Sequence, residues 1–91
     1  MRTMVGGFRE STSTKRYAAT GKEPEGQGRD VEYAYWVLAQ AIEEKFGPGG
    51  GTINEIYYQI TGPRFKLSLN DTIELVKAAY RAGYLEVVKG G

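Results

Sequence analysis

The sequence predicts a small α+β domain that is mainly α with a small β element. Three segments carry apolar residues at helical spacing and begin at residues that cap helices well. A short run of β-branched and aromatic residues follows the last segment and is typical of a strand. Residues 1–29 differ in composition, with many glycine and hydroxyl side chains. We therefore expect a flexible, disordered N-terminal arm over residues 1–29 and a three-helix domain over residues 30–91.

The first helix is expected to begin at Asp30, a good N-cap residue, and to end near Phe46. Glycine at position 47 accepts the left-handed conformation that ends a helix, and the proline after it cannot continue one. One face of this helix is expected to join the core through its apolar side chains, which are Val31, Ala34, Tyr35, Leu38, Ala41, Ile42 and Phe46.

The second helix is expected to be short, from about Ile53 to Ile60. Thr52 and Glu55 have the spacing of a capping box, in which each side chain accepts a hydrogen bond from an otherwise unpaired backbone N–H. Ile53, Ile56 and Ile60 or Tyr57 are its expected core residues. The glycine and proline at positions 62 and 63 end this helix.

The third helix is expected over residues 69–82, with Ser68 or Asn70 as its N-cap and Gly83 at its end. Residues 84–88 then predict a strand. A lone strand is not stable, so this one needs a partner. The candidates are residues near 51–53, part of the arm, or a second subunit. The side chains of the third helix expected in the core are Leu69, Thr72, Ile73, Val76, Ala79 and Tyr80.

The sequence contains no cysteine and no histidine. It therefore offers no disulfide, no Cys/His zinc site, no thiol nucleophile and no imidazole general base. We expect a binding protein rather than an enzyme, with no cofactor. No stretch approaches the roughly 20 apolar residues of a membrane span, and the beginning of the chain lacks a signal-peptide pattern. The expected location is the cytoplasm, without membrane contact.

The formal net charge of +1 conceals an uneven distribution. Basic side chains exceed acidic ones by three in residues 1–29, whereas acidic side chains exceed basic ones by two in residues 30–91. Within the domain, acidic residues concentrate in the first helix, and residues 62–91 hold an excess of two basic residues. The molecule is therefore expected to be polarised, with the third-helix side suited to an anionic partner.

The order of the predicted elements resembles that of the winged helix-turn-helix superfamily. The order is a long helix, a short capped helix, a third helix and a strand. The most telling stretch is Thr72 to Glu86, which looks like that superfamily's third helix running through a glycine, Gly83, into the first wing strand. The resemblance covers about 60 residues, from Asp30 to Lys89. Two features depart from the pattern, because residues 61–68 make a long turn and the sequence shows no return wing strand.

The resemblance implies that helix 69–82 is a recognition helix in the major groove of double-stranded DNA, and that the protein regulates transcription. On this helix the expected DNA contacts are Asn70, Lys77 and Arg81, although Asp71 and Glu74 on the same predicted face repel phosphates. Phe65 either stacks on a base or covers the core. The remaining expected contacts are Arg64 and Lys66 in the preceding loop, Lys89 after the strand, and Arg2, Arg9, Lys15 and Arg16 in the arm.

The first helix supports an alternative. Tyr33, Trp36 and Gln40 fall opposite its predicted core face, and aromatic side chains are frequent anchors of protein interfaces. This pattern predicts a homodimer or a protein partner. The alternative function is therefore a winged-helix interaction module that does not bind DNA.

Overall fold

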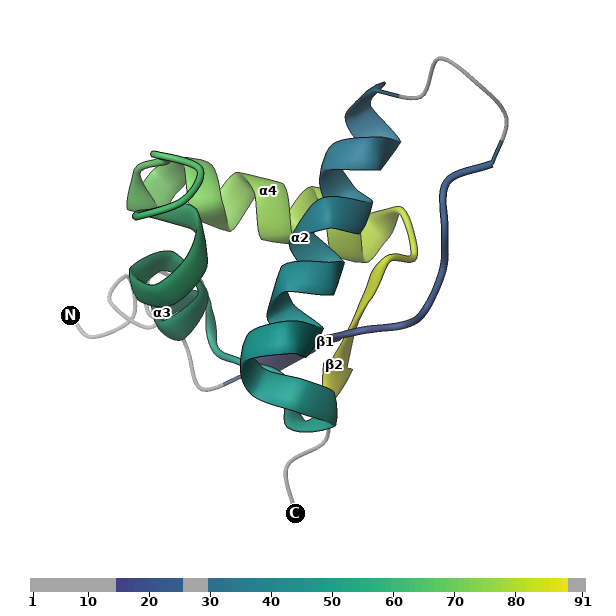
Figure 1. Cartoon of the computed structure of the whole chain (residues 1–91), viewed down its shortest axis with the longest axis horizontal. Coiled ribbons are helices and arrows are strands. Elements are labelled where there is room, and N and C mark those ends of the chain that lie inside the picture. Colours follow the sequence, from purple (N-terminus) through teal and green to yellow (C-terminus); the bar gives the residue numbers. More distant parts are fainter. Residues whose placement is uncertain (1–14, 26–29, 89–91) are drawn as a thin grey trace, which may run out of the picture.

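The computed structural model describes residues 15–25 and 30–88, and it confirms a mainly helical α+β fold. The chain runs through strand β1 (Arg16–Ala19), helix α2 (Asp30–Phe46) and a 3₁₀ turn η1 (Gly47–Gly49). It continues through the short helix α3 (Ile53–Ile56), a π-helical segment η2 (Tyr57–Thr61), helix α4 (Leu69–Arg81) and strand β2 (Leu85–Val88). Helix α2 crosses α4, and α3 lies beside the first half of α4 (Figure 1).

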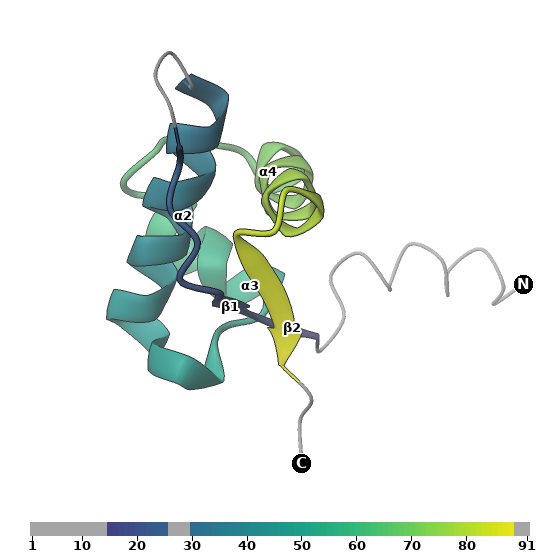
Figure 2. The same cartoon turned by 90° about the vertical axis from the view of Figure 1, so that its right-hand side faces the viewer.

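Strand β2 has an antiparallel partner in β1, with Arg16 opposite Val88 and Ala19 opposite Leu85. The other edge of β1 pairs with Gly51, which exchanges two backbone hydrogen bonds of 2.8 and 3.1 Å with Tyr17. Strand β1 thus lies between α2 and β2 (Figure 2). Of the candidate partners for β2, the N-terminal segment is the one that pairs with it.

Residues 16–19 are therefore part of the folded domain, which corrects the expectation of a flexible arm through residue 29. Tyr17 and Ala18 are buried, with 8% and 3% of their surface exposed. The reason is that β2 needs a hydrogen-bonded neighbour and the core needs a cover on the sheet side. Residues 1–14 and 26–29, also assigned to the arm, lie outside the described part of the chain.

The segment after β1, which contains Thr20 and Lys22, forms hydrogen bonds with the C-terminal end of α4. The hydroxyl of Thr20 donates to the carbonyl of Gly83 at 2.7 Å, and the ammonium of Lys22 donates to the carbonyl of Ala82 at 2.9 Å. The same ammonium lies 5.0 Å from the ring centre of Tyr84. A cation at the last carbonyls of a helix is favoured by the helix dipole, so this segment caps α4.

Most helix ends follow the predicted signals, but the second helix, predicted from about Ile53 to Ile60, is α-helical only from Ile53 to Ile56 and continues as the π-helical segment Tyr57–Thr61. The capping box of Thr52 and Glu55 is present, and the hydroxyl of Ser68 accepts the N–H of Asp71 at 3.1 Å, which makes Ser68 the N-cap of α4. Helix α2 spans the predicted residues from Asp30 to Phe46, but the Asp30 side chain lies outside what the structure describes. Among residues 15–25 and 30–88, no helix is both long and apolar enough to cross a bilayer.

The core lies between α2, α3, α4 and the sheet. Its buried side chains come from every one of these elements and include Leu38, Ile42, Ile56, Ile60, Val76, Tyr84 and Leu85. Among the described residues, two buried core positions are polar. Thr61 and Thr72 are fully buried, and their hydroxyls form a hydrogen bond of 2.6 Å. This pair ties the end of η2 to the first turn of α4.

Candidate functional site

The α4 side chains predicted to contact DNA are exposed in the structure. Asn70, Lys77 and Arg81 are separated by seven and four positions, so they follow one side of the helix. Lys77 and Arg81 make no ion pair with any residue in the described ranges. Their charges are therefore available to an anionic partner, and the burial of Thr72, Val76 and Ala79 fixes which way this side faces.

The acidic residues of α4 lie toward α2. Asp71 and Glu74 line an open groove of about 610 Å³ between α2 and α4, and neither Lys77 nor Arg81 does. The rest of this groove is apolar, with Ala34, Tyr35, Leu67, Leu75 and Ala78. Glu74 is seven residues before Arg81, so it sits at the border between the groove and the basic side. Asp71 therefore points about 100° away from the row of Asn70, Lys77 and Arg81, whereas Glu74 lies within that row, four positions after Asn70 and three before Lys77.

The long turn before α4 is held firmly by backbone hydrogen bonds. The N–H groups of Arg64, Phe65 and Leu67 donate to carbonyls of Ile60 and Thr61 at 2.9 to 3.2 Å. The side chains of Arg64 and Lys66 are exposed, whereas Phe65 is half-buried and packs against the core. Of the two interpretations of Phe65, the structure supports the core packing. The two cations therefore project from a well-ordered loop.

Arg16 has a role inside the protein. Its guanidinium donates to the carbonyls of Gly49 and Gly50 at 3.2 and 3.0 Å, and it pairs with a carboxylate oxygen of Glu55 at 3.2 Å. Because these bonds occupy the guanidinium, Arg16 is better described as joining β1 to the capping box than as a DNA contact. Lys15 is exposed. The other predicted contacts, Arg2, Arg9 and Lys89, lie outside the described residues.

The predicted interface on α2 is only partly free. Tyr33 is 56% exposed and Gln40 is also exposed. Trp36 is half-buried and packs against the core, with its ring centre 5.5 Å from that of Tyr33. The helical pattern predicted that Trp36 lies opposite the core face. This prediction was wrong, because Trp36 packs against the core. The exposed aromatic anchor at this position is Tyr33.

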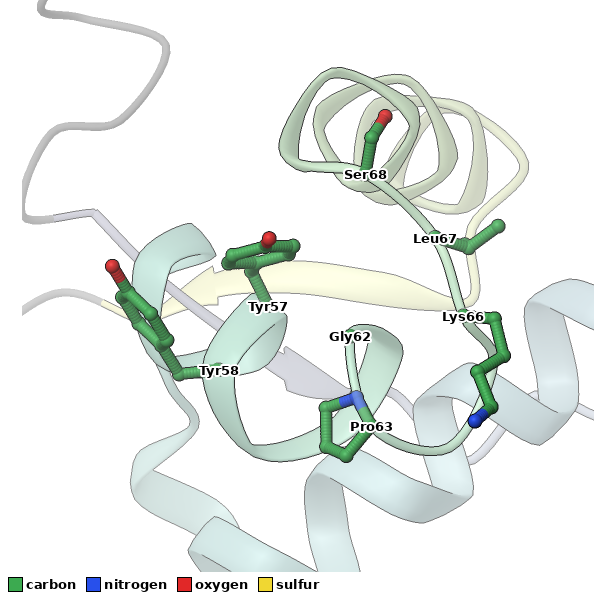
Figure 3. Close-up of a pocket in the computed structure, with 7 residues that line it drawn as sticks. All are labelled: Tyr57, Tyr58, Gly62, Pro63, Lys66, Leu67 and Ser68. Atoms are coloured by element: carbon green, nitrogen blue, oxygen red, sulfur yellow. The ribbon is translucent and has the colours of Figure 1, made fainter.

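A second groove, which the sequence did not predict, lies between η2 and the beginning of α4. It encloses about 610 Å³ and is lined by Tyr57, Tyr58, Gly62, Pro63, Lys66, Leu67 and Ser68 (Figure 3). Tyr58 is 73% exposed, the highest value among the large hydrophobic side chains of the described residues. The sequence feature that could have indicated this groove is the pair of adjacent tyrosines, Tyr57 and Tyr58, before the loop that contains Lys66. The π-helical turn that gathers them has no recognisable sequence pattern.

Comparisons with protein-family models, curated proteins and solved structures gave no match to this chain.

The two grooves flank α4 and differ in charge. Asp71 and Glu74 make the α2 groove acidic, whereas Lys66 is the charged residue lining the groove beside η2. The basic side of α4 adds Lys77 and Arg81. The surface from the long turn to the end of α4 is therefore suited to an anionic partner, and the α2 groove is suited to an apolar or basic one.

Proposed function

We propose that the chain is a cytoplasmic protein that binds double-stranded DNA and regulates transcription, with α4 in the major groove. The observation that carries this proposal is the exposed row of Asn70, Lys77 and Arg81 on a rigidly packed helix. An α-helix fits the major groove, where lysine and arginine bind guanine and asparagine binds adenine. The protein would act by binding rather than by catalysis.

The arrangement around α4 supports the winged-helix resemblance on which this proposal draws. Arg64 and Lys66 are exposed in the turn before α4, where they would contact phosphates. Strand β1 pairs antiparallel with β2, which gives β2 the partner that a stable sheet at the end of α4 requires.

The proposal is tested by measuring affinity for duplex DNA as a function of salt concentration. If Arg64, Lys66, Lys77 and Arg81 each displace about one counterion from the DNA, whether at a phosphate or at a base edge, log affinity should fall with log salt at a slope of about −3.6. The double variant Lys77→Ala/Arg81→Ala should reduce the steepness of this slope by about two units. Lys45→Ala on α2 is the matched control, because Lys45 is exposed in the last turn of α2 and lines neither groove beside α4.

Two outcomes would contradict DNA binding by α4. One is the absence of duplex binding even at low salt. The other is duplex binding that Lys45→Ala weakens as much as the α4 double variant does. Circular dichroism of each variant would verify that the helices are retained.

The exposed Tyr33 favours a second candidate, self-association or capture of a protein partner through α2. Tyr33 directly precedes Ala34 and Tyr35, which line the groove between α2 and α4, so one partner would cover both features. We expect Tyr33→Ser to lower the mass of the protein in solution from dimer to monomer, as measured by sedimentation. Gln59→Ser, at an exposed position of η2, serves as the control. A monomeric wild-type protein would exclude the homodimer.

A further inference from the structure

The groove between η2 and α4 has aromatic and basic walls. Tyr57 and Tyr58 line one side, and Lys66 comes from the long turn on the other side, with Gly62 and Pro63 between them (Figure 3). The two tyrosine rings lie 5.1 Å apart and are tilted by 60°. The groove's volume of about 610 Å³ is within the range of about 300–1,000 Å³ typical of small-molecule sites.

The backbone holds this groove in an unusual geometry. The N–H of Gly62 donates to the carbonyl of Tyr57 at 2.8 Å, which closes the π-helical turn. A Cβ atom at Gly62 would lie 2.7 Å from that carbonyl oxygen, so glycine is required there. Lys66 has a φ of 60°, a left-handed conformation that is uncommon for residues other than glycine. Both π-helical turns and such conformations occur often at functional sites.

The chemistry of the groove favours a nucleotide. An exposed tyrosine ring offers a stacking surface to any base, and the ammonium of Lys66 on the opposite wall can pair with a phosphate. Tyr58 is 73% exposed, and among the residues that the structure describes no acidic side chain lines the groove. Ser68 lines the same groove and precedes Asn70, the first residue of the basic side of α4, by only two positions. A DNA strand on α4 would therefore pass near the groove.

We propose that this groove binds an unpaired base of DNA, stacked on Tyr58, with the adjoining phosphate on Lys66. This inference rests on the proposed function and deepens it. The preferred ligand of the protein is then a duplex with a single-stranded extension, rather than a continuous duplex. The DNA duplex lies along α4, and the first unpaired nucleotide turns away from the DNA double helix and enters the groove.

The test compares a blunt duplex with the same duplex carrying a short oligo(dT) extension, first on one strand and then on the other. We expect one of the extended duplexes to bind about fivefold more tightly or better, which corresponds to the lower end of base–aromatic stacking energies. Tyr58→Ala should abolish this gain and leave affinity for the blunt duplex unchanged. Tyr58→Phe keeps the ring and should retain the gain. Tyr33→Ala is the matched control, because Tyr33 is an exposed tyrosine on α2.

The outcomes separate the inference from the function on which it rests. If the blunt duplex binds through Lys77 and Arg81 but neither extension increases affinity, the groove proposal is wrong and DNA binding stands. A gain that survives Tyr58→Ala, or that Tyr33→Ala also removes, equally overturns the groove proposal. If the wild-type protein binds none of the three ligands, both proposals fail. Binding of extended DNA alone, lost in Tyr58→Ala, would support the groove and contradict duplex recognition by α4.

Discussion

Tyr84 illustrates how one residue joins three parts of the molecule. Only 1% of its surface is exposed, and its hydroxyl donates to a carboxylate oxygen of Glu32 on α2 at 3.2 Å. Its ring lies 6.0 Å from that of Tyr35 and beneath the ammonium of Lys22. Burial raises the pKa of Tyr84 above its ordinary value, and the negative charge of Glu32 raises it further.

This raised pKa predicts a loss of stability in alkali. The contribution of Tyr84 to stability is complete below the ordinary tyrosine pKa of about 10 and is lost as pH rises through the higher folded-state pKa. Tyr84→Phe removes the titrating group, so the free energy of unfolding should decline less steeply above about pH 10. Urea denaturation over this pH range measures the effect. Tyr33→Phe replaces an exposed ring and should leave the decline of the unfolding free energy with pH as in the wild type. If Tyr84→Phe also leaves this decline unchanged, Tyr84 is not its source.

At the scale of elements, η2 and the beginning of α4 are connected by buried hydrogen bonds as well as by apolar packing. The hydroxyls of Thr61 and Thr72 bond to each other at 2.6 Å, and the carbonyl of Ser68 lies 2.9 Å from the hydroxyl of Thr72. A buried hydroxyl that loses its partner keeps the full cost of its desolvation. The pair therefore joins the basic turn and the groove beside it to the beginning of α4.

Substitutions at this joint should be non-additive. We expect Thr72→Val to lower the free energy of unfolding by about 1–3 kcal/mol, because it leaves the hydroxyl of Thr61 without that partner. The double variant Thr61→Val/Thr72→Val should cost clearly less than the sum of the two single variants, since no unpaired hydroxyl remains. A double-mutant cycle by chemical denaturation measures the coupling. Strict additivity would show that the two hydroxyls do not depend on each other.

Strand β1 is the element that the sequence pattern failed to reveal. Its residues, from Arg16 to Ala19, are too few and too mixed to show a period of two, and glycine and hydroxyl residues surround them. Their strand conformation comes from pairing with β2 and Gly51, far away in the sequence. Helices could be predicted well because their hydrogen bonds and caps are local, as at Thr52 and Ser68.

At the scale of the whole molecule, acidic and basic side chains adjoin each other on α4. The acidic groove between α2 and α4 contains Asp71 and Glu74, and the neighbouring exposed side of α4 carries Lys77 and Arg81. A near-neutral chain can therefore present a basic surface on one side. Glu74 lies at the border, where its negative charge would oppose an approaching phosphate.

Removing the charge at this border should strengthen the proposed DNA binding. We expect Glu74→Gln to increase duplex affinity roughly two- to fivefold at low salt, with the gain declining as salt increases, because surface charge interactions are weak and screened. Glu43→Gln, on the exposed side of α2, is the matched control and should have little effect. Fluorescence anisotropy with labelled duplex measures both variants. Weaker binding by Glu74→Gln would indicate that Glu74 contacts a base instead.

The sequence by itself determined the three helices, most of their ends, the final strand and the candidate cations on α4 and in the turn before it. These features depend on local spacing, capping and charge, which a linear pattern records. Only the tertiary structure decided that β1 completes the sheet, that Arg16 bonds internally and that Trp36 packs on the core. It also gathered Tyr57, Tyr58 and Lys66 around one groove. These outcomes depend on contacts between distant segments and on a π-helical turn, and packing selects both.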